Sequence, residues 1–141
     1  MNGLAFFDTN ILVYADDRSS PKKQDRAITL FSEHLRLGTA VISLQVLQEY
    51  FAAATRKLRV APDAAQRKVE ILARARVVRF DPSDVIAAIE FHRLGQVSFW
   101  DALIVHAARL ASAKTLYSED LQHGMVLGGV RVVNPFADEL K

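Results

Sequence analysis

Short runs of apolar residues alternate along the chain with longer stretches in which apolar residues recur every three or four positions. The short runs predict buried strands, and the longer stretches predict amphipathic helices. The expected strands cover residues 4–7, 40–42, 77–80, 115–117 and 130–133. The expected helices cover residues 11–14, 21–37, 44–56, 62–75, 82–94 and 99–113. Strands that alternate with helices favour right-handed βαβ crossovers, so the pattern predicts an α/β fold around a mostly parallel sheet.

The helix boundaries and buried faces follow from local signals. Pro21 follows Ser20 at one helix start, and Gly38 is expected to end the same helix. Its expected buried residues are Ile28, Phe31 and Leu35. In the next helix, one apolar stripe carries Leu44, Leu47, Phe51 and Ala54. The helix over residues 99–113 is apolar on nearly all sides, so we expect it to be buried, with Phe99 and Trp100 packed in the core.

Length and composition predict one globular domain over residues 1–141, since no linker or repeat divides the chain. Half of the residues are hydrophobic and 24% are charged, which argues against disorder. The chain contains no cysteine, which excludes disulfides and thiolate metal sites. No apolar run approaches the ~18 residues of a membrane span, and the N-terminus does not resemble a secretion signal. We therefore expect a cytoplasmic protein with no membrane partner.

Positive charge is concentrated in one segment, although the net charge of the chain is only +2. Residues 56–79 hold eight Lys or Arg against two Asp or Glu, whereas both flanking segments are mildly acidic. Such a segment can contact a phosphate backbone, or it can be no more than a solvated helix face. Charge alone leaves both interpretations open.

Three acidic residues occur where little water is expected. Asp8 directly follows the first predicted strand, and Asp120 lies just beyond the fourth. Because the carboxyl ends of parallel strands meet at one edge of a sheet, both side chains are expected at that edge. Asp101 lies in the first turn of an apolar helix whose start can face the same edge.

Carboxylates that converge on one pocket repel each other by roughly 4 kcal/mol per pair at ~4 Å and an effective dielectric constant of ~20. Protonation or a bound cation relieves this repulsion, and an all-oxygen ligand set suits Mg²⁺ or Mn²⁺. The four histidines lack the spacing of a zinc helix, and the glycines form no phosphate-binding loop.

Each acid also has a purely structural interpretation. Asp8 can cap the following turn, Asp101 can stabilise its own helix start, and Asp120 can be a turn residue. Glu49 can be an ordinary exposed glutamate on its helix. The functional interpretation gains weight because these acids occur together at the ends of strands and helices.

Four segments resemble the signatures of the PIN-domain nuclease family, in the family's order and over the whole chain. They are Phe6-Phe-Asp-Thr-Asn10, Gln45-x-x-Gln-Glu49, Ser98-Phe-Trp-Asp-Ala-Leu-Ile104 and Leu116-Tyr-Ser-Glu-Asp-Leu121. The length most resembles VapC-type toxins of toxin–antitoxin pairs. The resemblance implies a three-layer α/β/α sandwich and Mg²⁺- or Mn²⁺-dependent endoribonuclease activity. It also implies a homodimer, with an interface expected from exposed apolar side chains on the helices of residues 11–60, and inhibition by a VapB-like antitoxin.

The resemblance also assigns residues to the site. It implies catalytic roles for Asp8, Glu49, Asp101 and Asp120. Of these, Asp8 and Asp101 are the expected metal ligands, and Glu119 is an alternative to Asp120. The residues expected to shape the site are Thr9, Asn10 and Ser118. The RNA-binding residues are expected from the basic segment instead, and they are Arg56, Lys57 and Arg59.

The expected reaction is hydrolysis of an RNA phosphodiester bond by a metal-activated water, with one or two metal ions. A phosphatase of the haloacid-dehalogenase type is an alternative, because its aspartate nucleophile also follows a first strand. That family needs a second acid two positions later, where this chain has Asn10. A non-catalytic RNA- or protein-binding module is the other alternative, and four intact acids argue against it.

Overall fold

A six-stranded sheet forms the centre of the molecule in the computed structural model, which describes residues 3–95 and 97–137. The predicted domain of residues 1–141 therefore includes positions outside the described residues. The strands are β1 (Ala5–Phe7), β2 (Ala40–Ser43), β3 (Arg76–Val78), β4 (Thr115–Tyr117), β5 (Val126–Leu127) and β6 (Val130–Val133). Their order across the sheet is β3-β2-β1-β4-β6-β5. All neighbouring strands are parallel except β5 and β6, so the prediction of a mostly parallel sheet is confirmed.

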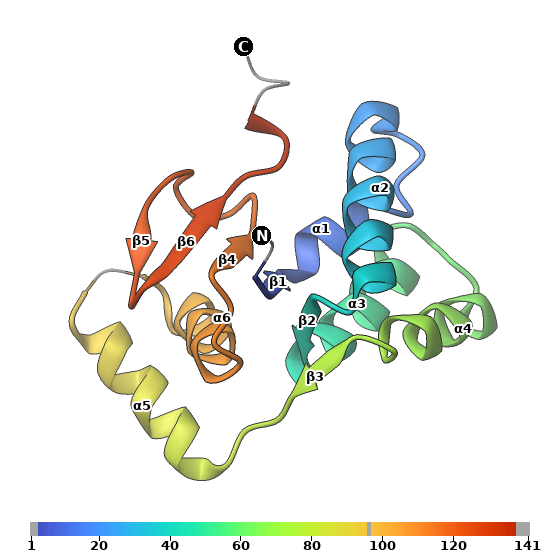
Figure 1. The fold of residues 1–141 in the computed structure, drawn as a ribbon. Coiled ribbons are helices and arrows are strands. Elements are labelled where there is room, and N and C mark those ends of the chain that lie inside the picture. The colour runs from blue at the N-terminus through green and yellow to red at the C-terminus, as the bar shows by residue number, and fades with distance from the viewer. Residues whose placement is uncertain (1–2, 96, 138–141) are drawn as a thin grey trace.

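Helices cover both faces of this sheet, as an α/β/α sandwich requires (Figure 1). The helices are α1 (Thr9–Tyr14), α2 (Pro21–Leu37), α3 (Leu44–Arg56), α4 (Pro62–Leu72), α5 (Pro82–Arg93) and α6 (Phe99–Leu110). The first four lie on one side, and α5 and α6 lie on the other (Figure 1). None of the described helices is long and apolar enough to cross a membrane.

The local signals place most boundaries correctly. Pro21 begins α2, and Gly38 ends it with a φ of 74°, a left-handed conformation that glycine adopts without steric cost. Ser98 caps α6 through a hydrogen bond from the backbone N–H of Asp101 to the Ser98 hydroxyl. The predicted burial of α6 is also confirmed, since its residues from Ala102 to Ala108 are buried except His106.

Two predicted buried faces are wrong in part. In α2, Phe31 is buried, but Ile28 is 43% exposed and Ala27 and Leu30 face the core in its place. The stripe predicted on α3 is turned outward at two of its positions, since Leu44 is 46% and Phe51 38% exposed. The residues of α3 that are buried against the rest of the protein are Val46, Tyr50 and Ala54. On each helix two neighbouring stripes fit a helical period, and the packing of the helix decides which one is buried.

The core prediction for Trp100 is wrong, because its side chain is 64% exposed and packs edge-on against Phe99. β5, a strand of only two residues, is absent from the predicted strands. It pairs with β6 through a tight turn in which Gly128 and Gly129 both have positive φ. The positive φ favours glycine at both positions, and the Arg109 side chain packs closely over Gly128.

The chain reverses its direction of travel across the sheet next to β1. It runs from β1 through β2 to the edge strand β3, and then crosses to the other side of β1 to form β4. Open parallel sheets bind ligands outside the carboxyl ends of the strands at such a switch point. Residues after Phe7 and Tyr117, which are paired in register, lie at this point.

Candidate metal centre

Asp8 emerges from the carboxyl end of β1 into an almost closed environment, with 5% of its surface exposed. The backbone N–H of Thr9 donates to Asp8 Oδ1 at 2.7 Å, so Asp8 is also the cap of α1. The hydroxyl of the buried Ser118, at the end of β4, donates to Asp8 Oδ2 at 2.8 Å. Both carboxylate oxygens are thus oriented by the two strands of the switch point.

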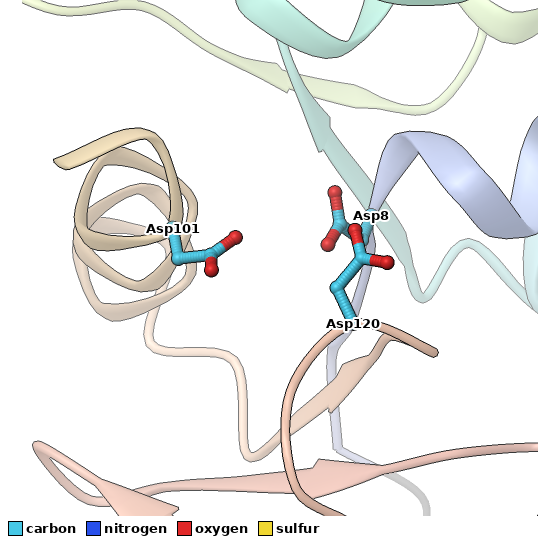
Figure 2. Close-up of side chains that lie close together, drawn as sticks. All are labelled: Asp8, Asp101 and Asp120. Carbon is cyan, nitrogen blue, oxygen red and sulfur yellow. The ribbon is translucent and has the colours of Figure 1, made fainter. Parts of the chain in front are cut away.

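Asp101 comes from the opposite side of the pocket. It lies in the first turn of α6, which Ser98 begins, and its side chain projects toward Asp8 (Figure 2). The helix runs antiparallel to the strands, so its start lies at their carboxyl ends. Asp101 therefore stabilises the start of its own helix and also lies at the carboxyl ends of the strands. Its structural and functional interpretations are compatible.

Asp120 is the third member of the group and is held by short polar contacts. Its backbone N–H donates to the Ser118 hydroxyl at 3.2 Å. The side-chain amide of Asn10 donates to Asp120 Oδ2 at 2.9 Å, and Asn10 Oδ1 accepts from the backbone N–H of Glu119 at 3.2 Å. Asn10 thus joins the start of α1 to the loop after β4, which keeps Asp120 beside Asp8.

The three carboxylates are close enough to share one cation. One oxygen from each of Asp8, Asp101 and Asp120 lies within 4.8 Å of the other two. The three side chains come from residues far apart in the sequence and converge on one space (Figure 2). This is a hard, all-oxygen donor set of the kind that Mg²⁺ or Mn²⁺ prefers.

The electrostatics of the group also fit a cation. Burial raises the pKa of Asp8 to about 7, against the hydrogen bonds from Ser118 and Thr9, and the charges of Asp120 and Asp101 raise it further. Burial is likewise the largest cause that raises the pKa of Asp101, and the charges of Asp120 and Glu49 act in the same direction. A positive ion among these groups would reverse both effects.

Glu49 lies beside this group without belonging to it. The Thr9 hydroxyl donates to Glu49 Oε1 at 2.6 Å, and the side-chain amide of Gln45 donates to Glu49 Oε2 at 3.0 Å. The structure therefore links Glu49 to the residue next to Asp8. The sequence analysis placed Thr9 in the site, but only the structure shows that Thr9 connects two acids.

Glu119 is directed elsewhere, which separates it from its neighbour Asp120. It accepts a hydrogen bond from the Tyr14 hydroxyl at 2.9 Å and forms an ion pair with Lys23. Lys23 also lies over the Tyr14 ring at 4.7 Å. The geometry favours Asp120 over Glu119 as the acid of the group.

The three basic residues predicted to bind RNA lie at different places. Arg56 and Lys57, at the end of α3, line a hollow together with Thr9 and Glu49. Arg59 instead lines a larger cavity farther along the surface. Arg56 and Lys57 therefore lie beside Glu49, and Lys57 also lines a hollow that includes Asp120.

A family model for the PIN domain matches residues 5–124. The chain belongs to the PIN domain family. This match extends over all four acidic segments described above. No match was found among curated protein sequences.

Solved PIN-type structures share the fold at low sequence identity. A toxin–antitoxin complex from Klebsiella pneumoniae matches with a TM-score of 0.66 and 20% identity over 93% of this chain and 97% of that one. VapBC2 from Rickettsia felis, bound to a promoter DNA fragment, matches with a TM-score of 0.65 and 21% identity over 92% and 96%. VapC20 from Mycobacterium tuberculosis, a toxin that cleaves the sarcin–ricin loop, matches with a TM-score of 0.59 and 18% identity over 81% and 88%. These similarities confirm the predicted PIN fold.

Proposed function

We propose that this PIN-domain protein is the toxin of a VapBC-type toxin–antitoxin pair and acts as an endoribonuclease that depends on Mg²⁺ or Mn²⁺. The observation that carries the proposal is the convergence of Asp8, Asp101 and Asp120 on one space. The PIN family match and the fold shared with toxin–antitoxin proteins support it.

The residues divide into those that would hold the ion and those that orient them. Asp8 and Asp101 are the main ligands, and Asp120 is a third ligand within reach. Ser118 and Asn10 fix the orientations of Asp8 and Asp120. A bound divalent ion would supply positive charge for the scissile phosphate and would lower the pKa of the attacking water.

Hydrolysis would proceed by attack of water on phosphorus, with the proton passing to a carboxylate of the site. The P–O3′ bond would break, and the leaving O3′ would take up a proton from solvent or from that carboxyl group, which gives a 5′-phosphate and a 3′-hydroxyl. Glu49 is a supporting acid in this scheme, since Thr9 and Gln45 hold it next to the metal ligands. The exposed side chains of Arg56 and Lys57 would contact the RNA backbone beside the acids.

The proposed partners are a VapB-like antitoxin and a second copy of the chain. Several of the structurally similar proteins are toxins in complex with an antitoxin, which supports an antitoxin partner here. Exposed apolar residues on α3 and α6, including Leu44, Phe51 and Trp100, offer a surface for a homodimer.

The first prediction is that Asp8→Asn abolishes RNA cleavage while the fold is retained. We expect at least a 100-fold loss of rate, because the amide removes a charged metal ligand from the centre of the group. The measurement is cleavage of structured RNA by antitoxin-free protein in Mg²⁺ or Mn²⁺, with circular dichroism as the check on folding.

Asp25→Asn is the matched control, since Asp25 is an exposed acid on α2. It should cleave at the wild-type rate, and excess EDTA should stop both active proteins. Full activity of Asp8→Asn, or of the wild type in EDTA, would contradict the proposal. RNA binding without cleavage by the metal-loaded wild type would support a non-catalytic binding module instead, and a covalent aspartyl-phosphate would support the phosphatase alternative.

A further inference from the structure

A cavity of about 840 Å³ lies between the loop after α1, the second half of α3 with the loop that follows it, and one side of α4. The five cationic side chains that line it are Arg18, Lys57, Arg59, Arg67 and Lys68. The two acids that line it are Asp16 and Asp17. The lining therefore has an excess of positive charge, although the whole chain is close to neutral.

One wall of the cavity is a fixed polar framework. Tyr50 is buried on α3, and its hydroxyl donates a hydrogen bond to Asp16 Oδ2. Burial raises the pKa of Tyr50, so its hydroxyl keeps the proton that it donates. Lys68 from α4 lies 3.4 Å from Asp16 Oδ1. The negative charge of Asp16 is thus already engaged within the protein.

The other cations that line the cavity lack such engagement. Arg67 forms only a long, exposed ion pair with Asp63 at 3.8 Å. Among the described residues, no ion pair of 4.0 Å or less involves Arg18, Lys57 or Arg59. All three side chains are exposed, so they can bind an anion without first breaking a contact.

Arg59 has an unfavourable backbone conformation, with a φ of 57° just after α3. The left-handed conformation costs a non-glycine residue roughly 1–2 kcal/mol, whereas glycine adopts it without this cost. The turn itself is needed, because it lets the Val60 N–H bond to the Ala54 carbonyl at 3.0 Å. Arg59 therefore occupies a position that glycine would fill at lower cost, and its exposed side chain lines the cavity.

The cavity is continuous with the acidic group. Asp17, Lys57 and Leu58 line both the cavity and an adjoining hollow of about 400 Å³. That second hollow is also lined by Asn10 and Asp120. A strand that places one phosphate at the carboxylates therefore has a direct path for its neighbouring phosphates into the cationic cavity.

We propose that this cavity binds a backbone phosphate of single-stranded RNA away from the scissile bond, with Arg18 and Arg59 as the binding cations. The proposal rests on the proposed function, since the substrate strand is what connects the two places. An RNA strand fits better than an acidic protein segment because it carries one charge per nucleotide along the whole path. The guanidinium groups of arginine match the geometry of phosphate oxygens.

The test compares RNA affinity across salt concentrations in the Asp8→Asn background, where cleavage does not interfere. The probe is a short single-stranded oligoribonucleotide, and the added change is the pair Arg18→Gln and Arg59→Gln. We expect at least a tenfold loss of affinity. The plot of log affinity against log salt should become shallower by about 0.7 for each phosphate contact removed. Arg93→Gln, an exposed arginine on α5 across the sheet, is the matched control and should change neither quantity.

Arg59→Gly separates binding from folding. Glycine suits the left-handed turn, so this variant should be at least as stable as the parent protein while losing RNA affinity. Wild-type affinity in Arg59→Gly, or an unchanged salt slope in the double variant, would overturn the proposal even if the wild type cleaves RNA. Conversely, loss of RNA affinity in these variants would support RNA binding by the cavity even if the wild-type protein did not cleave RNA in the first test. An octaglutamate peptide that binds through Arg18 and Arg59, with RNA affinity unaltered, would assign the cavity to an acidic protein segment and overturn the RNA proposal.

Discussion

Asp8 shows at the scale of one residue how a functional group can oppose folding. Its carboxyl is buried by the strands on either side of the switch point, and burial raises its pKa to about 7. The folded protein therefore holds this proton more tightly than the unfolded chain, whose carboxyl has an ordinary pKa of 3.8. At neutral pH the site carries a cost in folding free energy that a bound cation would offset.

Because the raised pKa of Asp8 lowers stability at neutral pH, we expect Asp8→Asn to be more stable than the wild type in EDTA. As pH rises from 3.8 to about 7, the wild type loses stability through Asp8, and above that range the loss is constant at roughly 4 kcal/mol. The asparagine variant lacks this loss. It should be the more stable protein at pH 8, and its advantage should grow by roughly 2–3 kcal/mol between pH 5 and pH 8.

Urea denaturation across this pH range measures the difference. Asp25→Asn, which replaces an exposed carboxyl on α2, is the control variant. Added Mn²⁺ should stabilise the wild type and leave Asp8→Asn unchanged. Parallel stability curves for Asp8→Asn and the wild type would show that Asp8 does not carry the raised pKa.

The start of α6 is the element on which the site depends most directly. The buried middle of this helix is fixed by the core, whereas its first turn holds the exposed Trp100 and the half-buried Asp101. The Ser98 hydroxyl accepts the N–H of Asp101 at 3.1 Å and thereby holds that turn. The position of a metal ligand thus depends on a helix cap.

Ser98→Ala should therefore weaken the metal centre more than it weakens the protein. We expect a loss of about 1 kcal/mol in the free energy of unfolding, and at least a tenfold weaker Mn²⁺ affinity because the first turn frays. Isothermal titration calorimetry and urea denaturation measure the two quantities. Ser98→Asn retains a good cap and should restore both. An unchanged Mn²⁺ affinity in Ser98→Ala would show that Asp101 is held by other contacts.

The ends of the helices were easier to predict from the sequence than their buried faces. Proline and glycine signals located both ends of α2, and a serine signal located the start of α6, because capping acts over one or two residues. The end of α6, predicted at residue 113, lies at Leu110. The buried faces of α2 and α3 were harder, since stripes through Val46 and through Leu44 both fit one helix. The choice between them depends on how β2 leads into α3, which is a tertiary property.

At the scale of the whole molecule, the acidic group was predictable because topology alone brings it together. Residues after β1 and β4 meet wherever these strands are parallel neighbours, and α6 must begin at the same edge. The direction of Glu119 was not predictable, because it depends on Lys23 and Tyr14 from another layer. The cationic cavity was equally hidden, since Arg18 lies far in sequence from the basic segment.

The proposed homodimer can be tested through the exposed apolar surface formed by Leu44, Phe51 and Trp100. Two adjoining grooves on this surface share Leu44, and one of them also includes Trp100. Trp100 is the only tryptophan in the chain, so tryptophan emission, excited at a wavelength that tyrosine does not absorb, reports on this surface. If a second copy covers the surface, the emission should shift to shorter wavelength as the protein concentration rises through the dissociation constant.

Leu44→Lys should raise that dissociation constant at least tenfold, or about 1.4 kcal/mol, since it places a charge in the covered surface. Sedimentation velocity measures the same equilibrium independently. Val126→Lys is the matched control, because Val126 is similarly exposed on β5, outside both grooves and outside the helices of residues 11–60. A dimer whose formation leaves the Trp100 emission unchanged would lie on another surface, and a monomer at every concentration would contradict the homodimer itself.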